Sequence, residues 1–412
     1  MNDRPQGWRD VAVAGVGMTR FGKLLETTNK ELVREAVEMA LGDAGVAKER
    51  IEAAYVGNSM AGLLTGQEAI RGQVTLAAMG IDTIPIFNIE NACASSSSAF
   101  HLAWVAVASG QYDCVLVVGF EKLYHAEKRR SFEALSSAMD VESGLAFLSE
   151  FSARQGGDAM LQPGAGESRS VFMDMYSFYA RRSMRELGLT QEHFAKIAVK
   201  SHKIAAHNPR AQYRREVTLD EVLASGDVVF PLTRMMCAPL GDGAAAAVLC
   251  SKERAAQVTT SPVWVAASVM GSGTMASEGD YVARAVAPRV YAAAGLGPED
   301  IDVVEVHDTT SPAEILSLVQ LGLCPGDQAA RWIDEGLTDL GGIMPTNPSG
   351  GLQSKGHPVG ATGTAQIFEI VSQLRGRSGP RQVEDARVGM TQNGGGVLGP
   401  GAAAMALHIF KR

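Results

Sequence analysis

One stretch decides the fold of this chain: Pro85-Ile-Phe-Asn-Ile-Glu-Asn-Ala-Cys93-Ala-Ser-Ser-Ser-Ser-Ala-Phe-His-Leu-Ala-Trp-Val-Ala-Val-Ala-Ser-Gly110. Residues 85–89 predict the end of a buried strand, the small and apolar residues from Ala94 onward predict a closely packed helix, and Gly110 is typical of the residue just past a helix. Cys93 therefore lies at a strand-to-helix turn, where free N–H groups and the positive end of the helix dipole favour a thiolate. A lone cysteine is more often an inert buried residue, so the stretch alone leaves both interpretations open.

The composition excludes several classes of protein. The chain has 412 residues, of which 46% are apolar, and a formal net charge of −8. This acidic balance argues against a nucleic-acid-binding surface, and no run approaches the roughly 18 apolar residues of a membrane span. Residues 1–10 are polar and lack the apolar core of a signal peptide. We therefore expect a cytoplasmic protein without a membrane span.

The cysteines are odd in number and widely spaced, without a CxxC pair: Cys93, Cys114, Cys237, Cys250 and Cys324. This pattern is typical of a reducing compartment and argues against a zinc site built by this chain alone. We expect no metal and no permanently bound cofactor.

Strands and helices alternate along the first part of the chain. Strands are predicted at 11–16, 51–56 and 113–119, and helices at 29–44 and 67–78. Such alternation predicts parallel pairing with right-handed crossovers, and therefore an α/β fold.

An internal repeat divides the chain into two halves. Residues 44–56 match residues 294–306 without gaps at a constant offset, and a weaker match relates the Cys93 helix and its following strand to 361–392. We predict two homologous α/β halves, 9–120 plus 233–258 and 259–412, that pack about a pseudo-twofold axis. The helix after Cys93 then lies beside its counterpart, and the loops that precede these two helices face one another.

A segment without a repeat partner, 121–232, lies between the halves. Two helices are predicted in it, at 171–187 and 191–208, and the charged run 127–130 is expected to be solvated. Insertions over an α/β core often cover a ligand. Its methionines either line an adaptable apolar pocket or fill the core of the insertion; they are Met139, Met160, Met173 and Met175.

Two histidines stand in positions that suit catalysis. His307 ends a predicted strand, and His357 lies in the Gly-rich stretch 347–363, which opens a helix and lets backbone N–H groups face a ligand. By the repeat argument this loop faces the Cys93 loop, and an imidazole beside a thiol can take its proton. The turn 391–396 is also rich in glycine and can present backbone donors to an oxyanion. Together these loops favour a catalytic site.

The chain resembles the thiolases, and among them those related to sterol-carrier-protein-2 thiolase. The likeness covers nearly the whole chain and is carried by five motifs: Val11-Ala-Val-Ala-Gly-Val-Gly-Met-Thr-Arg-Phe-Gly22, Asn91-Ala-Cys-Ala-Ser-Ser96, Cys237-Ala-Pro-Leu-Gly-Asp-Gly-Ala-Ala-Ala-Ala247, His307-Asp308 and Gly356-His-Pro-Val-Gly-Ala-Thr-Gly363. The resemblance implies a five-layered αβαβα core with an inserted loop domain, at least a homodimer, and acyl-CoA and CoA as substrates.

The resemblance also assigns roles to residues. Cys93 would form the acyl-enzyme, His357 would activate it and help bind the thioester oxygen, and His307 would hold an oxyanion-hole water. The backbone N–H groups of Cys93 and Gly394 would form the other oxyanion hole. Two further residues are expected near the oxyanion or substrate: Asn347 and Cys237.

One departure from the thiolase pattern bears on the substrate. Thiolases carry a second cysteine as the acid/base for the CoA enolate, whereas the corresponding positions here hold Gln392 and Thr309. The candidate substitutes are Cys237, an ordered water or a tyrosine of the insertion, and we favour the first two. The missing thiol suggests a specialised substrate. Similar chains cleave aromatic or branched β-ketoacyl-CoA together with a small zinc-ribbon and OB-fold partner subunit, as in a benzoylsuccinyl-CoA-type thiolase.

Two other functions stay open. Some thiolase-like chains resemble retro-aldolases that use tyrosines as bases, although such chemistry does not need the sulfur of Cys93. A non-catalytic acyl-CoA-binding subunit is the second alternative, and the complete set of Cys93, His307 and His357 argues against it.

Overall fold

The computed structural model describes residues 7–154, 159–258, 261–275 and 282–412. The strands are β1 (Val11–Met18), β2 (Ala53–Gly57), β3 (Ile86–Ile89), β4 (Cys114–Glu121), β5 (Asp227–Val229), β6 (Leu232–Thr233), β7 (Gly243–Ser251), β8 (Val263–Ser272), β9 (Val303–Glu305), β10 (Val388–Leu398) and β11 (Gly401–Lys411). The helices are α1 (Asn29–Ala44), α2 (Ala61–Thr65), α3 (Arg71–Ala77), α4 (Ser95–Ala108), α5 (Lys128–Ser136), α6 (Gly144–Arg154), α7 (Val171–Leu187), α8 (Gln191–Ala206), α9 (Leu219–Leu223), α10 (Lys252–Ala255), α11 (Val282–Ala294), α12 (Ser311–Leu321), α13 (Ala329–Asp334) and α14 (Thr362–Leu374). Among the described residues, no helix combines the length and the apolar character that crossing a membrane requires.

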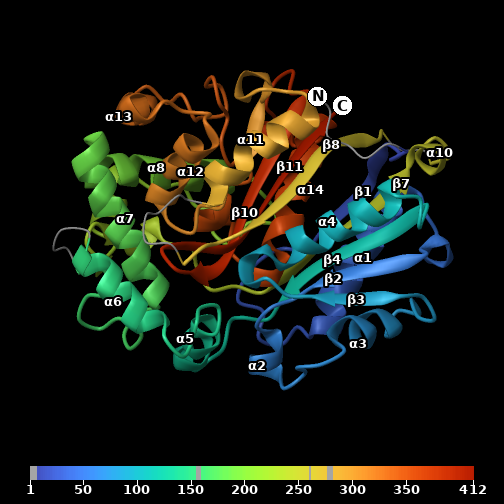
Figure 1. Ribbon diagram of the computed structural model, residues 1–412, viewed down its shortest axis with the longest axis horizontal. Helices are drawn as coiled ribbons and strands as arrows, with labels where there is room; N and C mark the ends of the chain where they lie inside the picture. Colours follow the sequence, from blue (N-terminus) through green and yellow to red (C-terminus); the bar gives the residue numbers. More distant parts are fainter. Residues whose placement is uncertain (1–6, 155–158, 259–260, 276–281) are drawn as a thin grey trace.

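The strand order reveals the two halves. Nine strands follow one another as β3-β2-β4-β7-β1-β8-β11-β10-β9. Figure 1 labels the strands of this order from β3 to β10. Read outward from the centre, β1, β7, β4 and β2 correspond to β8, β11, β10 and β9. The halves join through two residue pairs between β1 and β8, Ala12 with Trp264 and Val13 with Val263. The predicted pair of homologous α/β halves is confirmed by this mirrored order.

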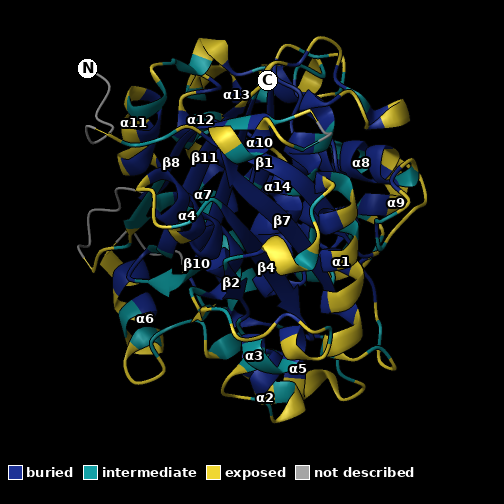
Figure 2. Ribbon diagram, turned by 90° about the vertical axis from the view of Figure 1, so that its right-hand side faces the viewer, coloured by how far each residue is buried: buried dark blue, intermediate teal, exposed yellow. Residues whose placement is uncertain are grey.

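The helices form three layers around the two halves of the sheet. Helices α4 and α14 pack on each other and on both halves, and therefore lie between them (Figure 1). Helix α1 packs on the opposite face of β1 and β7, while α11 packs on β8 and β11. The strands and the central helices are buried, whereas the outer face of α1 is exposed (Figure 2). This arrangement is the predicted five-layered core.

Local sequence explains why α1 forms where it was predicted. The Thr28 hydroxyl accepts a hydrogen bond from the Glu31 N–H, and the Glu31 carboxylate accepts one from the Thr28 N–H, so the two cap the helix reciprocally. Its apolar residues recur every three or four positions and are buried. Gly45 ends the helix in the left-handed conformation, with φ of 64°.

Two sequence-based predictions need correction. The helix predicted over 67–78 is shorter, because Ile70 has a φ of 49°, which a helix does not accommodate, and α3 begins only at Arg71. The strand predicted as buried at 85–89 is β3, the last strand of its half, and Phe87 and Asn88 are exposed on it. The apolar residues of this segment are compatible with either a central or an edge strand. The position in the sheet depends on strand pairing, which the local sequence does not show.

The inserted segment forms its own small core beside the sheet. Helix α7 has the predicted bounds, and α8 ends two residues before the predicted Asn208. The methionines divide between the two interpretations. Met160 is buried in the core of the insertion and Met139 packs against it, Met173 lines a cavity described below, and Met175 belongs to the same core and also lines a cavity. The boundaries 121–232 and 258/259 stay predictions, and residues 259–260 lie outside the described residues.

The two central helices meet at their N-termini through very small residues. A Cβ atom added to Gly363 would lie 2.0 Å from Ser97 Oγ and 2.6 Å from the Ser97 backbone nitrogen. The Thr364 N–H donates to Ser96 Oγ at 3.0 Å. Any larger side chain at Gly363 would force the two halves apart at the point where the loops face one another.

We therefore expect Gly363→Ala to lower the free energy of unfolding by about 1–3 kcal/mol, as overpacking of a tight contact does. The matched control is Gly42→Ala, because Gly42 lies in α1 with no atom within 4 Å of an added Cβ. That change should be neutral or stabilise by up to about 1 kcal/mol, since alanine is the better helix former. Chemical denaturation of both variants and of the wild-type protein checks this. A Gly363→Ala midpoint equal to that of wild type would contradict the tight contact.

Candidate active site

Cys93 lies in a single 3-10 turn, residues 92–94, between β3 and α4. The residue before it, Ala92, has a φ of 48°, a strained conformation for alanine. The turn rests directly on β10, because a Cβ on Gly395 would lie 2.1 Å from the Asn91 carbonyl oxygen. Glycine at 395 is thus needed for the close approach of β10 to the turn that presents the sulfur.

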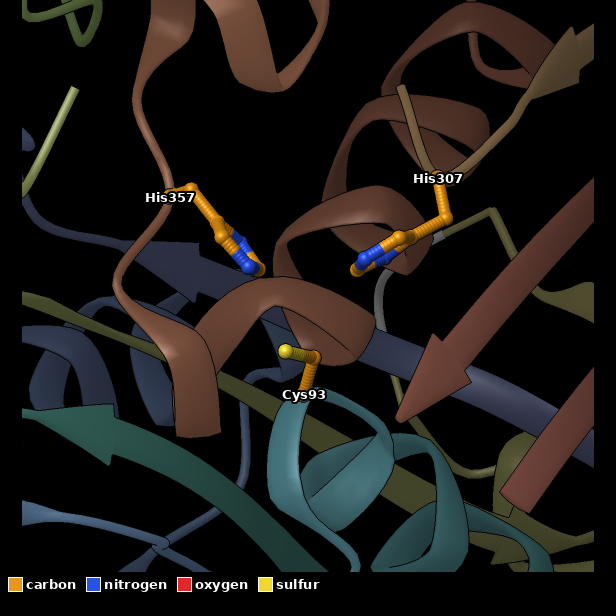
Figure 3. A group of neighbouring side chains, drawn as sticks. All are labelled: Cys93, His307 and His357. Atoms are coloured by element: carbon orange, nitrogen blue, oxygen red, sulfur yellow. The ribbon is translucent and has the colours of Figure 1, made fainter. Parts of the chain in front are cut away.

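The two histidines converge on Cys93 from the other half of the molecule. His307 follows β9, and His357 lies between a π-helical turn (Gly351–Lys355) and the start of α14. Cys93 Sγ and one ring nitrogen from each histidine lie within 4.8 Å of one another (Figure 3). The two imidazole rings are nearly perpendicular, with centroids 5.1 Å apart. The predicted meeting of the two loops is therefore present.

Hydrogen bonds give the two imidazoles opposite tautomers. His357 Nδ1 lies 2.7 Å from Thr362 Oγ1, whose own proton goes to the Pro358 carbonyl. Nδ1 of His357 is then the donor, and its Nε2 is free to accept a proton. His307 Nδ1 instead lies 3.0 Å from the Asn393 amide nitrogen, which donates. His307 Nε2 consequently carries the proton, so one ring is a base and the other a donor.

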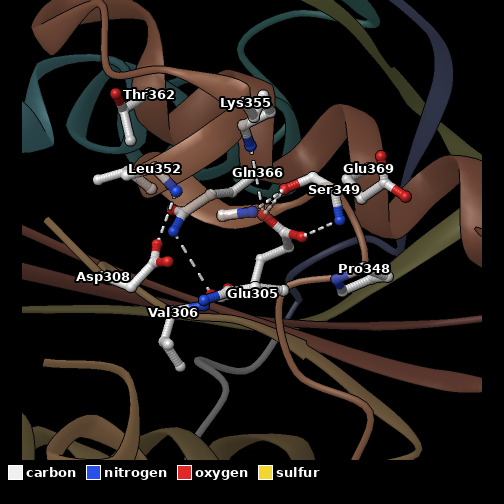
Figure 4. Close-up of polar contacts among 12 residues, drawn as sticks. Glu305, Val306, Asp308, Pro348, Ser349, Leu352, Lys355, Thr362, Gln366 and Glu369 are labelled. Atoms are coloured by element: carbon white, nitrogen blue, oxygen red, sulfur yellow. Dashed lines mark hydrogen bonds and ion pairs between the residues drawn. The ribbon is translucent and has the colours of Figure 1, made fainter. Parts of the chain in front are cut away.

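Buried carboxylates join the strand end that carries His307 to the loop that carries His357 (Figure 4). Glu305 is paired with Lys355 at 3.3 Å and accepts hydrogen bonds from the backbone and hydroxyl of Ser349. Asp308 accepts from the Leu352 N–H at 2.7 Å and from the Gln353 amide. These contacts fix the backbone on either side of the two histidines.

Burial governs the protonation of the site. It raises the pKa of Cys93 to about 12, although hydrogen bonds from the backbone of Gly396 and of Cys93 itself oppose the rise. It lowers the pKa of His307 to about 4, and that of His357 well below its ordinary value. The thiolate predicted from the helix N-terminus is therefore not the resting form: desolvation outweighs the dipole, and a neutral thiol faces a neutral imidazole.

Two cavities meet at Cys93. The smaller, of about 170 Å³, is largely apolar and is lined by residues that include Phe172, Met175, His307, Leu316 and Met405. The larger, of about 690 Å³, is lined by residues that include His357, Thr309 and Cys237 and by four basic side chains: Lys23, Lys128, Arg169 and Arg234. Four residues line both cavities: Cys93, Phe172, Tyr176 and Gly396.

Of the three other residues expected at the site, two line the cavities and one does not. Gly394 lines the smaller cavity, but the backbone that hydrogen-bonds the sulfur is that of Gly396. Cys237 lines the larger cavity, and its thiol donates to the Thr233 carbonyl. Asn347 is not brought to the site: its amide donates to Glu314 and its side-chain oxygen accepts from the Val306 N–H.

Sequence reasoning missed Tyr176 as an individual residue. It lies on α7 of the insertion and reaches the sulfur only through tertiary packing. The sequence predicted only that some tyrosine of the insertion could replace the missing cysteine, and it did not indicate which one.

The cluster of Cys93, His307 and His357 has the residue types of a metal site. A histidine that binds zinc donates its other N–H to an acceptor. At His307 the other nitrogen faces a donor, because the Asn393 carbonyl oxygen is already engaged by Ser97 Oγ at 2.8 Å. The surroundings thus suit a proton donor better than a metal ligand.

We accordingly expect purified protein to carry well below one equivalent of zinc, measured by elemental analysis against protein concentration. Chelator treatment should leave alkylation of Cys93 by iodoacetamide unchanged, because no metal holds its sulfur. One equivalent of metal that is lost in Cys93→Ser would contradict the expectation of a metal-free site.

The comparisons with known proteins agree with this geometry. The family model described as "Thiolase, N-terminal domain" matches residues 11–253, and "Thiolase C-terminal domain-like" matches residues 270–408. The chain is 40% identical to an acetyl-CoA acetyltransferase of Methanothermobacter thermautotrophicus, over 98% of this chain and 100% of that protein. It is 36% identical to sterol carrier protein 2 of Gallus gallus, over 96% of this chain and 71% of that protein.

A solved structure is also similar over nearly the whole chain. The structure named "Ltp2-ChsH2(DUF35) aldolase" superposes with a TM-score of 0.76 at 26% identity, covering 98% of this chain and 97% of that one. The matching family models, the mirrored halves and the paired loops at Cys93 lead to one conclusion. The chain has the thiolase fold, belongs to the thiolase family close to its sterol-carrier-protein-2 members, and is a thiolase-type acyltransferase.

Proposed function

We propose that the protein cleaves a β-ketoacyl-CoA with CoA, or runs the reverse condensation, through an acyl group carried on Cys93. The observation that carries the proposal is the junction of two cavities at a sulfur within 4.8 Å of two imidazoles. Acyl transfer needs a nucleophile, a base that takes its proton and a hydrogen-bond donor that stabilises the oxyanion, and these three groups meet here.

The proposed first step is proton transfer from the Cys93 thiol to Nε2 of His357. The sulfur then attacks the β-keto carbon, and the bond between the α and β carbons breaks, leaving a thioester on Cys93 and a CoA enolate. His307 Nε2–H and the backbone N–H groups around Cys93, Gly394 and Gly396 are the donors proposed for the developing oxyanions. CoA then collects the acyl group, and the cysteine recovers its proton from His357.

The charges of the cavities suggest how the substrate is placed. The larger cavity combines four basic side chains with one acidic side chain, Asp227, which suits the phosphates of CoA. The smaller cavity is lined by aromatic and aliphatic side chains, which suits an aromatic or branched acyl group. A specialised substrate of this kind is also what the missing second cysteine suggests.

Three further assignments belong to this proposal. A homodimer is supported by the open edge of β3, where Phe87 is 43% exposed. A small zinc-ribbon and OB-fold partner subunit is supported by the aldolase structure whose name includes a DUF35 component. A cytoplasmic location is supported by five cysteines that are all free.

The second candidate function is retro-aldol cleavage of an acyl-CoA without acyl transfer. It is favoured by the likeness to the Ltp2-ChsH2(DUF35) aldolase and by the presence of Tyr176 beside Cys93. The two functions differ in one respect: aldol cleavage does not need the sulfur, so it would survive Cys93→Ala.

The first prediction concerns the acyl-enzyme. Incubation with linear, branched and aromatic β-ketoacyl-CoA compounds, without free CoA, should increase the protein mass by one acyl group at Cys93. Cys93→Ala should abolish both the adduct and thiolysis, and His357→Ala should slow thiolysis by about a hundredfold or more, as loss of a general base does. His207→Ala, at an exposed histidine of no assigned role, is the control. Near-normal thiolysis in His357→Ala would contradict its role.

The second prediction concerns pH. Because burial holds the pKa of His357 well below its ordinary value, the base stays neutral as the pH falls. An ordinary imidazole would be about three-quarters protonated at about pH 6. Acylation of Cys93 by acetyl-CoA, followed as first-turnover CoA release, should therefore change less than about twofold between pH 8 and pH 6. A fall centred near pH 6.5 would contradict the lowered pKa.

A further inference from the structure

The reaction needs an acid that no cysteine of the usual kind supplies here. Departure of the CoA enolate requires a proton at its α carbon, and the two positions that carry the second cysteine in thiolases hold Gln392 and Thr309. Gln392 is engaged elsewhere, because its side-chain amide oxygen accepts a hydrogen bond from the backbone N–H of His307 at 2.7 Å. Thr309 ends in a hydroxyl, which is far too weak an acid to replace a thiol, and the side chain that it interacts with is Tyr176.

Tyr176 lies where that acid is required. It is one of the four residues that line both cavities, and of these four only Cys93 and Tyr176 carry an ionisable proton. Its helix, α7, packs on α12, the helix that begins directly after the Thr309-Thr310 pair. The phenol is close enough to both Thr309 and Cys93 for each to influence its ionisation. Tyr176 therefore lies beside Thr309, one of the two positions that carry the second cysteine in thiolases.

We propose that the phenol of Tyr176 is the acid/base that protonates the α carbon of the CoA enolate. This inference rests on the function proposed above and adds a catalytic residue to it.

The proton balance of the proposed cycle closes without another reactant. When the bond between the α and β carbons breaks, its electron pair stays on the α carbon, which takes the proton of the Tyr176 hydroxyl. The resulting phenolate then takes the proton of the incoming CoA thiol, and the CoA sulfur attacks the acyl-Cys93 thioester. As that intermediate collapses, the Cys93 sulfur regains the proton held by His357. Both proton carriers end the cycle as they began.

The ionisation of Tyr176 suits this role. Burial is the main cause that raises its pKa. The hydrogen bond with Thr309 opposes the rise, and the nearby Cys93 and Asp308 add to it, so the resting side chain is a neutral phenol. A neutral phenol gives its proton readily to a carbanion, and a phenolate of raised pKa is a strong base toward a thiol.

The alternative acid Cys237 fits less well. It lines the larger cavity only, and its thiol proton is directed to the Thr233 carbonyl oxygen, 3.5 Å away. Burial alone determines the shift in its pKa, whereas that of Tyr176 also responds to Cys93. An ordered water is the remaining alternative, and it would persist without the phenol.

The experiment separates acyl transfer from carbon–carbon cleavage. The substrate is the β-ketoacyl-CoA of the panel that wild-type protein cleaves fastest, and acetyl-CoA tests acylation alone. Tyr176→Phe should lower cleavage by about a hundredfold or more, as loss of a general acid does, yet still form the acetyl adduct at Cys93. Acylation should be slowed far less than cleavage. A CoA thiolate is stable enough to leave without the phenol proton that the proposed cycle gives it, whereas a carbanion is not. The adduct also shows that the variant is folded.

The matched control is Tyr291→Phe, which removes a buried phenol outside both cavities. It should keep cleavage and acylation. Near-normal cleavage in Tyr176→Phe would overturn the inference in favour of water, or of Cys237 if Cys237→Ala then loses cleavage with its adduct intact. Loss of the adduct together with cleavage in Tyr176→Phe would also overturn it, because the phenol would then be needed equally for departure of a CoA thiolate and would have no special role at the α carbon. Absence of any adduct in wild-type protein would instead contradict the proposed function itself.

Discussion

The close contact between the N-termini of α4 and α14 determines the geometry of the active site. Each helix belongs to a different half, and each is preceded by a loop that carries part of the chemistry. Because Gly363 lies directly against Ser97, the two helices approach closely enough for the loops to touch. Cys93 and His357 are 264 positions apart in the chain (357 − 93), yet they meet because their helices do. The contact is also polar, since Ser96 accepts from the Thr364 N–H, and Ser97 ties α4 to β10 by donating to Asn393.

Buried charges then fix what the helix contact brings together. Glu305 and Lys355 are almost wholly inaccessible to solvent, and each lies two positions before a catalytic histidine. Breaking a buried ion pair by removing one partner leaves an uncompensated charge, which is strongly destabilising. The pair therefore resists small displacements of the two histidines relative to each other. Asp308 adds a second link by holding the turn that precedes His357.

Periodicity and repetition predicted the architecture, because both are recorded in local sequence. The spacing of apolar residues in α1 and α7 gave their bounds, and the repeat placed the Cys93 and His357 loops face to face. Position in a sheet is a tertiary property, so β3 was predicted to be buried although it is an edge strand. The pKa of Cys93 could not be predicted from the sequence. The helix N-terminus next to the thiol is a local feature, whereas the burial that raises its pKa depends on the tertiary structure. Tyr176 escaped for the same reason: nothing near it in sequence records that α7 packs on α12.

The edge position of β3 has a consequence for how the protein responds to its surroundings. The strand leads directly into the turn that carries the sulfur, and Ala92 holds that turn in a strained conformation. Its outer side offers backbone groups to any chain that pairs with it. Pairing there would stiffen the segment that leads to the nucleophile, whereas loss of the pairing would let it relax. A chain that paired with Ile86–Ile89 would therefore act on the backbone that leads to the nucleophile as well as on the size of the assembly.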